Sequence, residues 1–215
     1  MKHIVDMETW SRKEDYGFFA TLQNPNISIT SEIKCEEALK RAKREQKSFF
    51  IYYMYALLAA TNELPEFRFR IDNEERVIYF DTVDVMTPIK INEEGECAIV
   101  RIPWRENFEE FYALAKEIID EAKSNNGAYN SAPEAGGETL DVTFLSATPD
   151  LYFTSLTSAQ ERRNGNSYPL VNVGKAVRRE GELVMPVALT VHHGFVAGHH
   201  LSLFYKKVEE ILNQL

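Results

Sequence analysis

Features that are scarce or missing in the 215-residue sequence exclude several broad classes of protein. Its two cysteines, Cys35 and Cys97, lack the close spacing of a zinc or redox motif, so we expect reduced thiols. No apolar run approaches membrane-spanning length, and the N-terminus scatters charges where a signal peptide needs an apolar core. The formal net charge is −9, whereas nucleic acids and anionic membranes both require a positive field. We therefore expect a cytoplasmic protein that binds no nucleic acid and no membrane.

The motifs of several common enzyme classes are missing as well. The Gly-x-Ser-x-Gly elbow of serine hydrolases does not occur, and neither does the His-Glu-x-x-His pattern of zinc proteases. The glycine patterns of Rossmann and P-loop phosphate sites are also absent. These absences argue against a nucleotide-phosphate site of those types and against a serine hydrolase.

Hydrophobic periodicity predicts strands and helices along one domain, residues 1–215, without internal repeats. The apolar run 49–60 predicts a helix that is buried on most sides and ends before Pro65. Residues 124–138 form a long loop, which in a compact domain is usually functional or mobile. The other predicted segments are strands at 27–33, 67–71, 76–80, 87–91, 98–102 and 142–147, two strands around the turn 179–182, helices at 35–46 and 108–122, and a final helix along 201–212. This order indicates an α/β two-layer sandwich, with a large mixed β-sheet and helices packed on it.

A cluster of histidines near the C-terminus is the strongest candidate for chemistry. His192 and His193 follow the apolar run 187–191, and a glycine and two further histidines occupy residues 198–200. An imidazole at the end of a strand can act as a base toward a bound substrate. Successive strand side chains point to opposite faces, so we expect one of the pair to be the base and the other to be structural. A hydrogen-bonded core histidine and a metal ligand are the alternatives, although the spacing favours no metal site.

Five segments, in order and with similar separations, resemble the chloramphenicol acetyltransferase family. They are residues 6–14 with Trp-x-Arg-Lys-Glu, residues 28–33, residues 144–149 with Ser-Ala-x-Pro, residues 168–175, and the histidine segment 189–200. The family pattern in the last segment is His-His-x-x-x-Asp-Gly. The resemblance implies a coenzyme A-dependent acyltransferase fold and a homotrimer with active sites between subunits.

The resemblance also implies roles for individual residues. His193 is the general base that takes the proton from an acceptor hydroxyl, which attacks the thioester of acetyl-CoA without an acyl-enzyme. Ser146 matches the serine that hydrogen-bonds the oxyanion of the tetrahedral intermediate. Asn172 stands where relatives have a threonine that assists the transition state through water. Lys175 stands where a basic residue lies near the coenzyme.

The sequence departs from the family pattern at two further places. Ala197 replaces the aspartate that pairs, in the family, with the arginine matched by Arg12 and so holds the histidine loop. Arg12 must then find another carboxylate or remain solvated, because a buried unpaired charge costs several kcal/mol. Phe19 replaces a tyrosine that contacts the substrate. If Arg12 has no other partner, Ala197→Asp should raise turnover.

The first hypothesis is therefore an acetyl-CoA-dependent O-acetyltransferase that acts on chloramphenicol or a similar small hydroxylated acceptor, with antibiotic resistance as the implied role. The alternative from another class is a catalytically impaired trimer that has the same fold and binds a ligand without useful turnover. Metal-dependent hydrolysis is the third hypothesis, and bound zinc would reveal it.

Overall fold

The computed structural model describes residues 1–124, 139–159 and 167–215. The predicted loop at 124–138 therefore lies outside the described residues, except for Ser124. Within the described ranges, the chain forms a seven-stranded sheet in the order β2-β10-β8-β7-β5-β6, with β9 paired to β10. The strands are β2 (Asn26–Lys34), β5 (Asp84–Lys90), β6 (Cys97–Ile102), β7 (Val142–Thr148), β8 (Leu170–Gly174), β9 (Val177–Arg179) and β10 (Glu182–His192). The pairs β5–β7 and β7–β8 are parallel and the others are antiparallel, which confirms the predicted mixed sheet.

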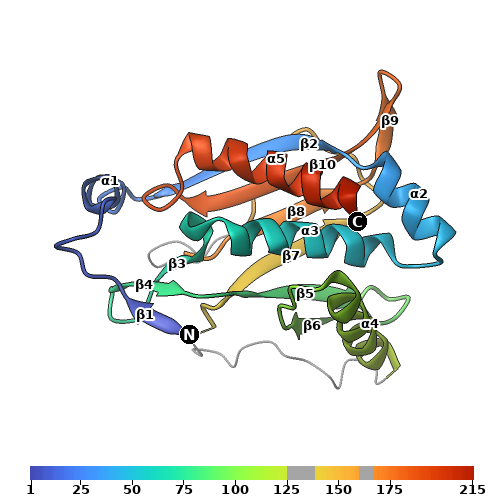
Figure 1. The fold of residues 1–215 in the computed structure, drawn as a ribbon, viewed down its shortest axis with the longest axis horizontal. Helices are drawn as coiled ribbons and strands as arrows, with labels where there is room; N and C mark the ends of the chain where they lie inside the picture. The colour runs from blue at the N-terminus through green and yellow to red at the C-terminus, as the bar shows by residue number, and fades with distance from the viewer. Residues whose placement is uncertain (125–138, 160–166) are drawn as a thin grey trace.

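Helices cover one face of this sheet, as Figure 1 shows for α3 and α5. The helical segments are α1 (Lys13–Phe19), α2 (Glu36–Arg44), α3 (Phe49–Glu63), the short 3-10 helix η1 (Pro65–Arg68), α4 (Phe108–Ser124) and α5 (Gly198–Gln214). Helix α3 packs against α2, α4 and α5 as well as against the sheet, so its apolar side chains are buried nearly all round. The prediction of a buried helix ending before Pro65 is confirmed, and the layers are those of an α/β sandwich.

A small second sheet pairs β1 (Lys2–Ile4), β4 (Val77–Phe80) and β3 (Phe69–Ile71). Strands β3 and β4 form the predicted antiparallel hairpin. Four elements of the described residues were not predicted: β1, α1, β8 and the 3-10 helix η1, which takes Phe67 and Arg68 from the strand predicted at 67–71. The three residues of β1 are exposed, and none of the seven residues of α1 is buried, so β1 and α1 have no apolar periodicity that reveals them in the sequence.

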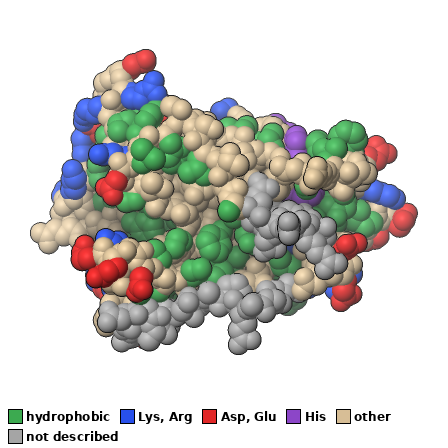
Figure 2. Space-filling view, turned by 180° about the vertical axis from the view of Figure 1, so that it is seen from behind, with side chains coloured by type: hydrophobic (Ala, Val, Ile, Leu, Met, Phe, Trp, Pro, Cys, Tyr) green, Lys and Arg blue, Asp and Glu red, His purple; other side chains and the backbone are tan. Residues whose placement is uncertain are grey.

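The face of the sheet opposite the helices carries small and polar side chains in its middle strands. Ser146, Asn172 and Ala188 are register partners across β7, β8 and β10, so their side chains share one face. Their neighbours Leu145 and Val171 point to the other face and belong to the hydrophobic core. Seen from behind, hydrophobic and uncharged side chains occupy the middle of this face, and charged side chains gather toward its two ends (Figure 2).

Candidate active site

His192, the last residue of β10, is a buried and uncharged histidine. Only 2% of its surface is exposed, and its ring packs against the rings of Tyr16 and Phe195, with centroid distances of 5.8 and 4.7 Å. Burial, together with the neighbouring His193, lowers the pKa of His192 to about 4. The amide of Gly194 donates a hydrogen bond to its Nδ1 at 3.2 Å, which requires an unprotonated Nδ1. His192 therefore supports the turn that follows the strand.

His193 is half-buried, and its imidazole is held from two sides. Its Nδ1 lies 3.0 Å from the carbonyl oxygen of Val196. Because a carbonyl only accepts hydrogen bonds, Nδ1 carries the proton in the neutral ring and Nε2 keeps its lone pair. The ring of Phe19 stacks on the imidazole at a centroid distance of 4.0 Å and an interplanar angle of 25°. The His193 amide donates to the Pro25 carbonyl at 2.8 Å, which fixes the backbone where β10 ends.

The turn between β10 and α5 is tight, because two backbone amides donate hydrogen bonds to the same carbonyl oxygen. Phe195 and Val196 both donate to the His192 carbonyl oxygen, at 3.0 and 3.1 Å. A Cβ on Gly194 would lie 3.1 Å from the Tyr16 Cα and 3.0 Å from the His192 Cε1. Only glycine fits this position without displacing α1 or the His192 ring.

Arg12 joins α1 to this turn, and it has a carboxylate partner. Its Nε donates to the Gly194 carbonyl oxygen at 3.3 Å, and its Nη2 lies 3.2 Å from Oδ2 of Asp15. The question left open by Ala197 is therefore answered: Asp15, one turn further along α1, supplies the carboxylate. The spacing of three residues on a helix places such a pair side by side, and this was the signal available in the sequence.

Ala197 is the N-cap residue of α5 and has no side-chain acceptor. Its amide instead donates to Nδ1 of His200, at 3.0 Å. This role of His200 was not predictable from the sequence, because a capping side chain three residues into a helix is usually glutamate or glutamine.

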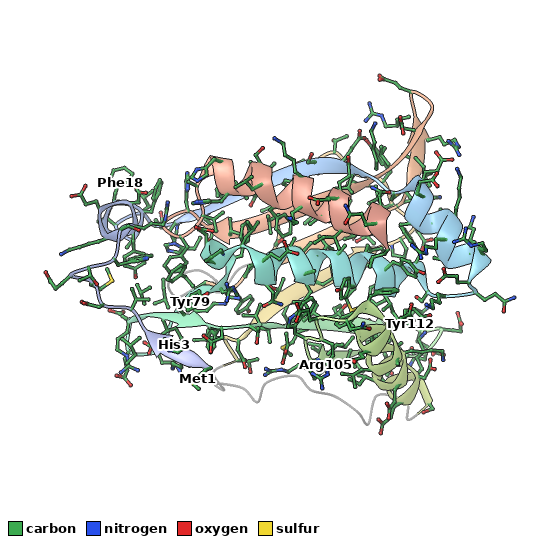
Figure 3. The ribbon with its side chains drawn as sticks, viewed as in Figure 1. Met1, His3, Phe18, Tyr79, Arg105 and Tyr112 are labelled. Atoms are coloured by element: carbon green, nitrogen blue, oxygen red, sulfur yellow. The ribbon has the colours of Figure 1, made fainter. Side chains whose placement is uncertain are left out.

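The exposed apolar ring of Phe18 projects from α1 beside this turn, at one end of the molecule (Figure 3). It is 64% exposed and contacts the Phe19 ring edge to face. A cavity of about 450 Å³ opens nearby, against His192 and α1. Its lining residues are Tyr16, Ala20, Leu22, Gln23, Pro25, Ile71, Glu75 and His192. A partly apolar cavity therefore lies close to the histidine turn.

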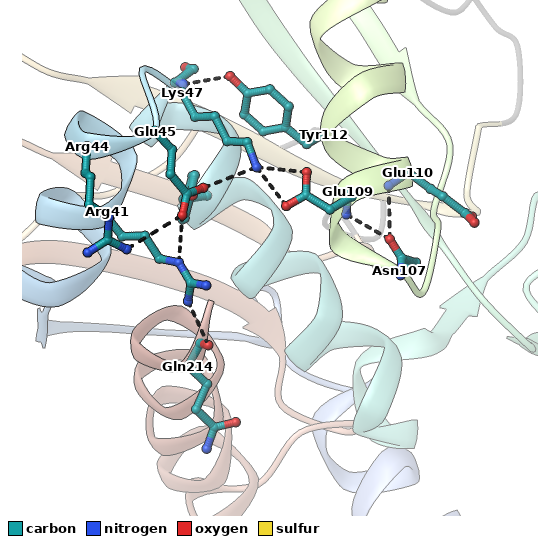
Figure 4. Close-up of polar contacts among 11 residues, drawn as sticks. Arg41, Arg44, Glu45, Lys47, Asn107, Glu109, Glu110, Tyr112 and Gln214 are labelled. Carbon is teal, nitrogen blue, oxygen red and sulfur yellow. Dashed lines mark hydrogen bonds and ion pairs between the residues drawn. The ribbon is translucent and has the colours of Figure 1, made fainter.

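Ser146 belongs to a different cavity, of about 700 Å³, that lies between β5, β7, α4 and the start of α3. Lys90, Lys116 and Lys123 line this cavity together with apolar side chains such as Ile51. Gln46 and Ser48, which line one side of this cavity, belong to the connection between α2 and α3. A polar network links this connection to α4 (Figure 4).

In this network the Lys47 Nζ lies 3.2 Å from a Glu45 carboxylate oxygen and 2.7 Å from a Glu109 carboxylate oxygen. The Tyr112 hydroxyl accepts the Ser48 amide at 2.8 Å. These contacts fix α4 relative to α3, and so fix the width of the larger cavity.

Within one chain, the structure does not bring Ser146 and His193 together. Ser146 is level with Asn172 and Ala188 in the sheet, and His193 follows Ala188 by five residues. At about 3.3 Å per residue, the two side chains are about 16 Å apart along the strand direction. Asn172 instead donates to the Ser158 hydroxyl at 2.9 Å. Lys175 is exposed beyond the end of β8.

The residues that the structure describes contain no candidate metal site. Among them, no group of three or more histidine, cysteine, aspartate and glutamate side chains is arranged to hold a metal ion. In the same ranges, no helix combines the length and the apolar character that crossing a membrane requires.

Comparison with known proteins gives one family. The family model described as chloramphenicol acetyltransferase matches residues 2–209. A chloramphenicol acetyltransferase of Staphylococcus aureus is 24% identical over 210 residues, covering 96% of this chain and 94% of the relative. Chloramphenicol acetyltransferase 3 of Escherichia coli is 22% identical over 208 residues, covering 97% and 95%.

Solved structures show the same fold. A chloramphenicol acetyltransferase structure has a TM-score of 0.87 and 50% sequence identity, and the match covers 99% of this chain and all of that one. The dihydrolipoamide acetyltransferase of Azotobacter vinelandii, at 16% identity and a TM-score of 0.64 with 90% and 84% covered, shares the fold alone. Both the family match and the 50% identical structure span nearly the whole chain, and the chain belongs to the chloramphenicol acetyltransferase family of coenzyme A-dependent acyltransferases.

Proposed function

We propose that this protein transfers the acetyl group of acetyl-CoA to a hydroxyl of chloramphenicol or a similar small acceptor, with His193 as the general base. The observation that carries this proposal is the contact between Nδ1 of His193 and the Val196 carbonyl oxygen. It leaves Nε2 as the basic nitrogen on an imidazole that is otherwise immobilised by Phe19. The family membership supports the reaction and both substrates.

The reaction proceeds in a ternary complex. Nε2 of His193 takes the hydroxyl proton of the acceptor while the acceptor oxygen attacks the thioester carbonyl of acetyl-CoA. The Ser146 hydroxyl donates a hydrogen bond to the oxyanion, which strengthens as negative charge develops. Collapse of the tetrahedral intermediate breaks the carbon–sulfur bond, and the coenzyme A thiolate takes the proton from the imidazolium. The products are the acetyl ester and free coenzyme A.

A homotrimer with shared active sites explains the separation of Ser146 and His193 within one chain. In this arrangement, His193 of one subunit faces Ser146 on the sheet of its neighbour. The middle of the sheet face behind the helices carries hydrophobic and uncharged polar side chains and few charges, which supports such packing. The cavity lined by Ser146 offers space for the acyl-pantetheine arm of acetyl-CoA. Asn172 is the register partner of Ser146 on β8, and Lys175 is exposed just beyond the end of that strand.

We further propose that the enzyme is a cytoplasmic homotrimer with a role in antibiotic resistance, and the family membership supports the role in resistance. The alternative of an impaired ligand-binding trimer rested on the loss of the aspartate at Ala197. Arg12 has Asp15 as its partner, and the imidazole of His193 is oriented, so no observation favours that alternative.

Complementation between two inactive variants tests the proposal. His193→Ala and Ser146→Ala proteins are assayed separately for thiol release from acetyl-CoA with chloramphenicol, and then as mixed trimers made by co-expression. If each site takes its histidine and its serine from different subunits, random mixing restores about a quarter of wild-type activity. His192→Ala serves as the control, since it is expected to cost stability and leave chemistry in the folded fraction. Mixed trimers no more active than the separate variants would contradict the shared site, and an active His193→Ala protein would contradict the assigned base.

A further inference from the structure

His200 occupies the third position of α5 and is buried, with 7% of its surface exposed. Its Nδ1 accepts the Ala197 amide proton at a distance of 3.0 Å. A part-buried backbone amide at a helix start costs free energy if it has no acceptor. His200 therefore fills the role that a glutamate or glutamine usually plays in this half of a capping box.

The tautomer of His200 follows from this bond. Because Nδ1 accepts, the proton of the neutral ring is on Nε2, which lies 3.6 Å from Oε1 of Glu66. The other groups that face the ring are His199, at a centroid distance of 3.7 Å, and the guanidinium of Arg12. Burial, His199 and Arg12 lower the pKa of His200, and the carboxylate of Glu66 opposes them. The balance keeps Nδ1 available as an acceptor at neutral pH.

The two bonded histidines meet at one peptide group. The carbonyl oxygen that holds Nδ1 of His193 belongs to Val196, and the amide that His200 accepts belongs to Ala197. This C=O and N–H are the two ends of a single planar peptide unit, which rotates only as a whole. Hydrogen bonds at both ends polarise the unit in the same sense and strengthen each other. Rotation of this peptide would break both bonds and release the His193 ring.

We propose that His200 is a positioning residue for the general base, acting through the peptide that joins Val196 to Ala197. It fixes that peptide so that the Val196 carbonyl faces Nδ1 of His193, and this keeps Nε2 as the basic nitrogen. The role does not require contact with substrate. The kinetic part of the test rests on the proposed function, whereas the spectroscopic part does not.

Three variants distinguish the effect of the hydrogen-bond acceptor of His200 from the effect of its ring. His200→Phe keeps a ring and removes the acceptor, and His200→Asn places an acceptor oxygen at the same number of bonds from Cα as Nδ1. His199→Phe is the matched control: it changes the exposed neighbour that lies against the His200 ring, keeps an aromatic ring there and leaves the His200 acceptor in place. We expect kcat of His200→Phe to fall at least tenfold with both KM values within threefold, because a misplaced base loses rate while binding survives. His200→Asn and His199→Phe should stay within threefold of wild type.

Nitrogen-15 NMR of the intact enzyme tests the same chain of contacts without turnover. In wild type and His200→Asn, His193 should be protonated at Nδ1 only, and the Ala197 amide should exchange slowly. In His200→Phe, the His193 ring should show mixed tautomers, and the Ala197 amide should exchange at least tenfold faster. This readout holds even if chloramphenicol is not the acceptor.

The outcomes are decisive in both directions. Wild-type kcat in His200→Phe, or a His200→Asn enzyme as slow as His200→Phe, would overturn the proposal. If His200→Phe does not fold, His200→Asn and His200→Gln decide: retained kcat and a single His193 tautomer support the role, and a folded enzyme at least tenfold slower refutes it. An inactive wild type with the expected NMR result would refute the proposed function alone.

Discussion

Mild acid should destabilise this protein through His192, a residue outside the proposed chemistry. Burial lowers the pKa of His192 from its ordinary value of 6.5 to about 4. Between these values the unfolded chain binds a proton that the native chain does not, so the free energy of unfolding rises with pH across this window. The contribution is complete above pH 6.5 and is lost as pH falls toward 4. Between pH 7 and pH 5, the loss amounts to about 2 kcal/mol, because one pKa unit corresponds to about 1.4 kcal/mol.

The comparison variant is His192→Asn, which keeps an acceptor for the Gly194 amide and does not titrate in this range. Chemical denaturation at one fixed protein concentration, from pH 7 to pH 5, gives the free energy of unfolding of both proteins. The variant is expected to be less stable at pH 7, because the packing of the ring is lost. Between pH 7 and pH 5, however, its free energy of unfolding should fall by about 2 kcal/mol less than that of wild type, which corresponds to about 4 to 8 °C in Tm. Staying above pH 5 limits the contribution of carboxylates such as Glu45, which act near and below their ordinary pKa of 4.5. Parallel curves for the two proteins would refute the reasoning.

Two other substitutions test the surroundings of the base. Phe19→Tyr should keep the stacking on His193 and hence kcat, while an added hydrogen bond of about 0.5 to 1.5 kcal/mol lowers KM for chloramphenicol. Phe18→Tyr is the matched control on the exposed neighbouring ring, and equal effects of both variants on KM would argue against a specific contact. Ala197→Asp should stabilise the protein by about 1 kcal/mol with kcat changed less than threefold, as measured by denaturation and by thiol release.

The main layers of the fold were predictable because their elements carry long, regular apolar patterns. Helix α3 was identified by an apolar run that only a nearly surrounded helix can bury, and Pro65 marked its end. Strand β8, in contrast, has only five residues and lies inside the sheet. Such a short apolar segment cannot be recognised as a strand from its periodicity. Helix α1 gave no signal because its seven residues bury no side chain completely.

The candidate base was predictable from local pattern, but its supports were not. His193 follows a strand and precedes a helix, and both are visible in the sequence. The Val196 carbonyl that orients the ring is a backbone group, and no residue type reveals where a backbone oxygen points. Asp15 was overlooked for a different reason: the family pattern directed attention to Ala197, some 180 residues away, whereas the carboxylate lies one helical turn from Arg12.

The prediction for Ala197→Asp reverses the expectation from the family pattern, because the turn already has two supports. An aspartate at this N-cap would accept the His200 amide and complete the capping box, which adds stability. Turnover should change little, since the Arg12 bond to the Gly194 carbonyl is backed by Asp15 and the Ala197 amide is held by His200. Asp15→Asn is the informative partner: it should lower kcat severalfold, and adding Ala197→Asp to it should restore much of the loss. If Ala197→Asp alone raised kcat tenfold and Asp15→Asn left kcat unchanged, the turn would lack support in the wild-type protein and Asp15 would not hold it.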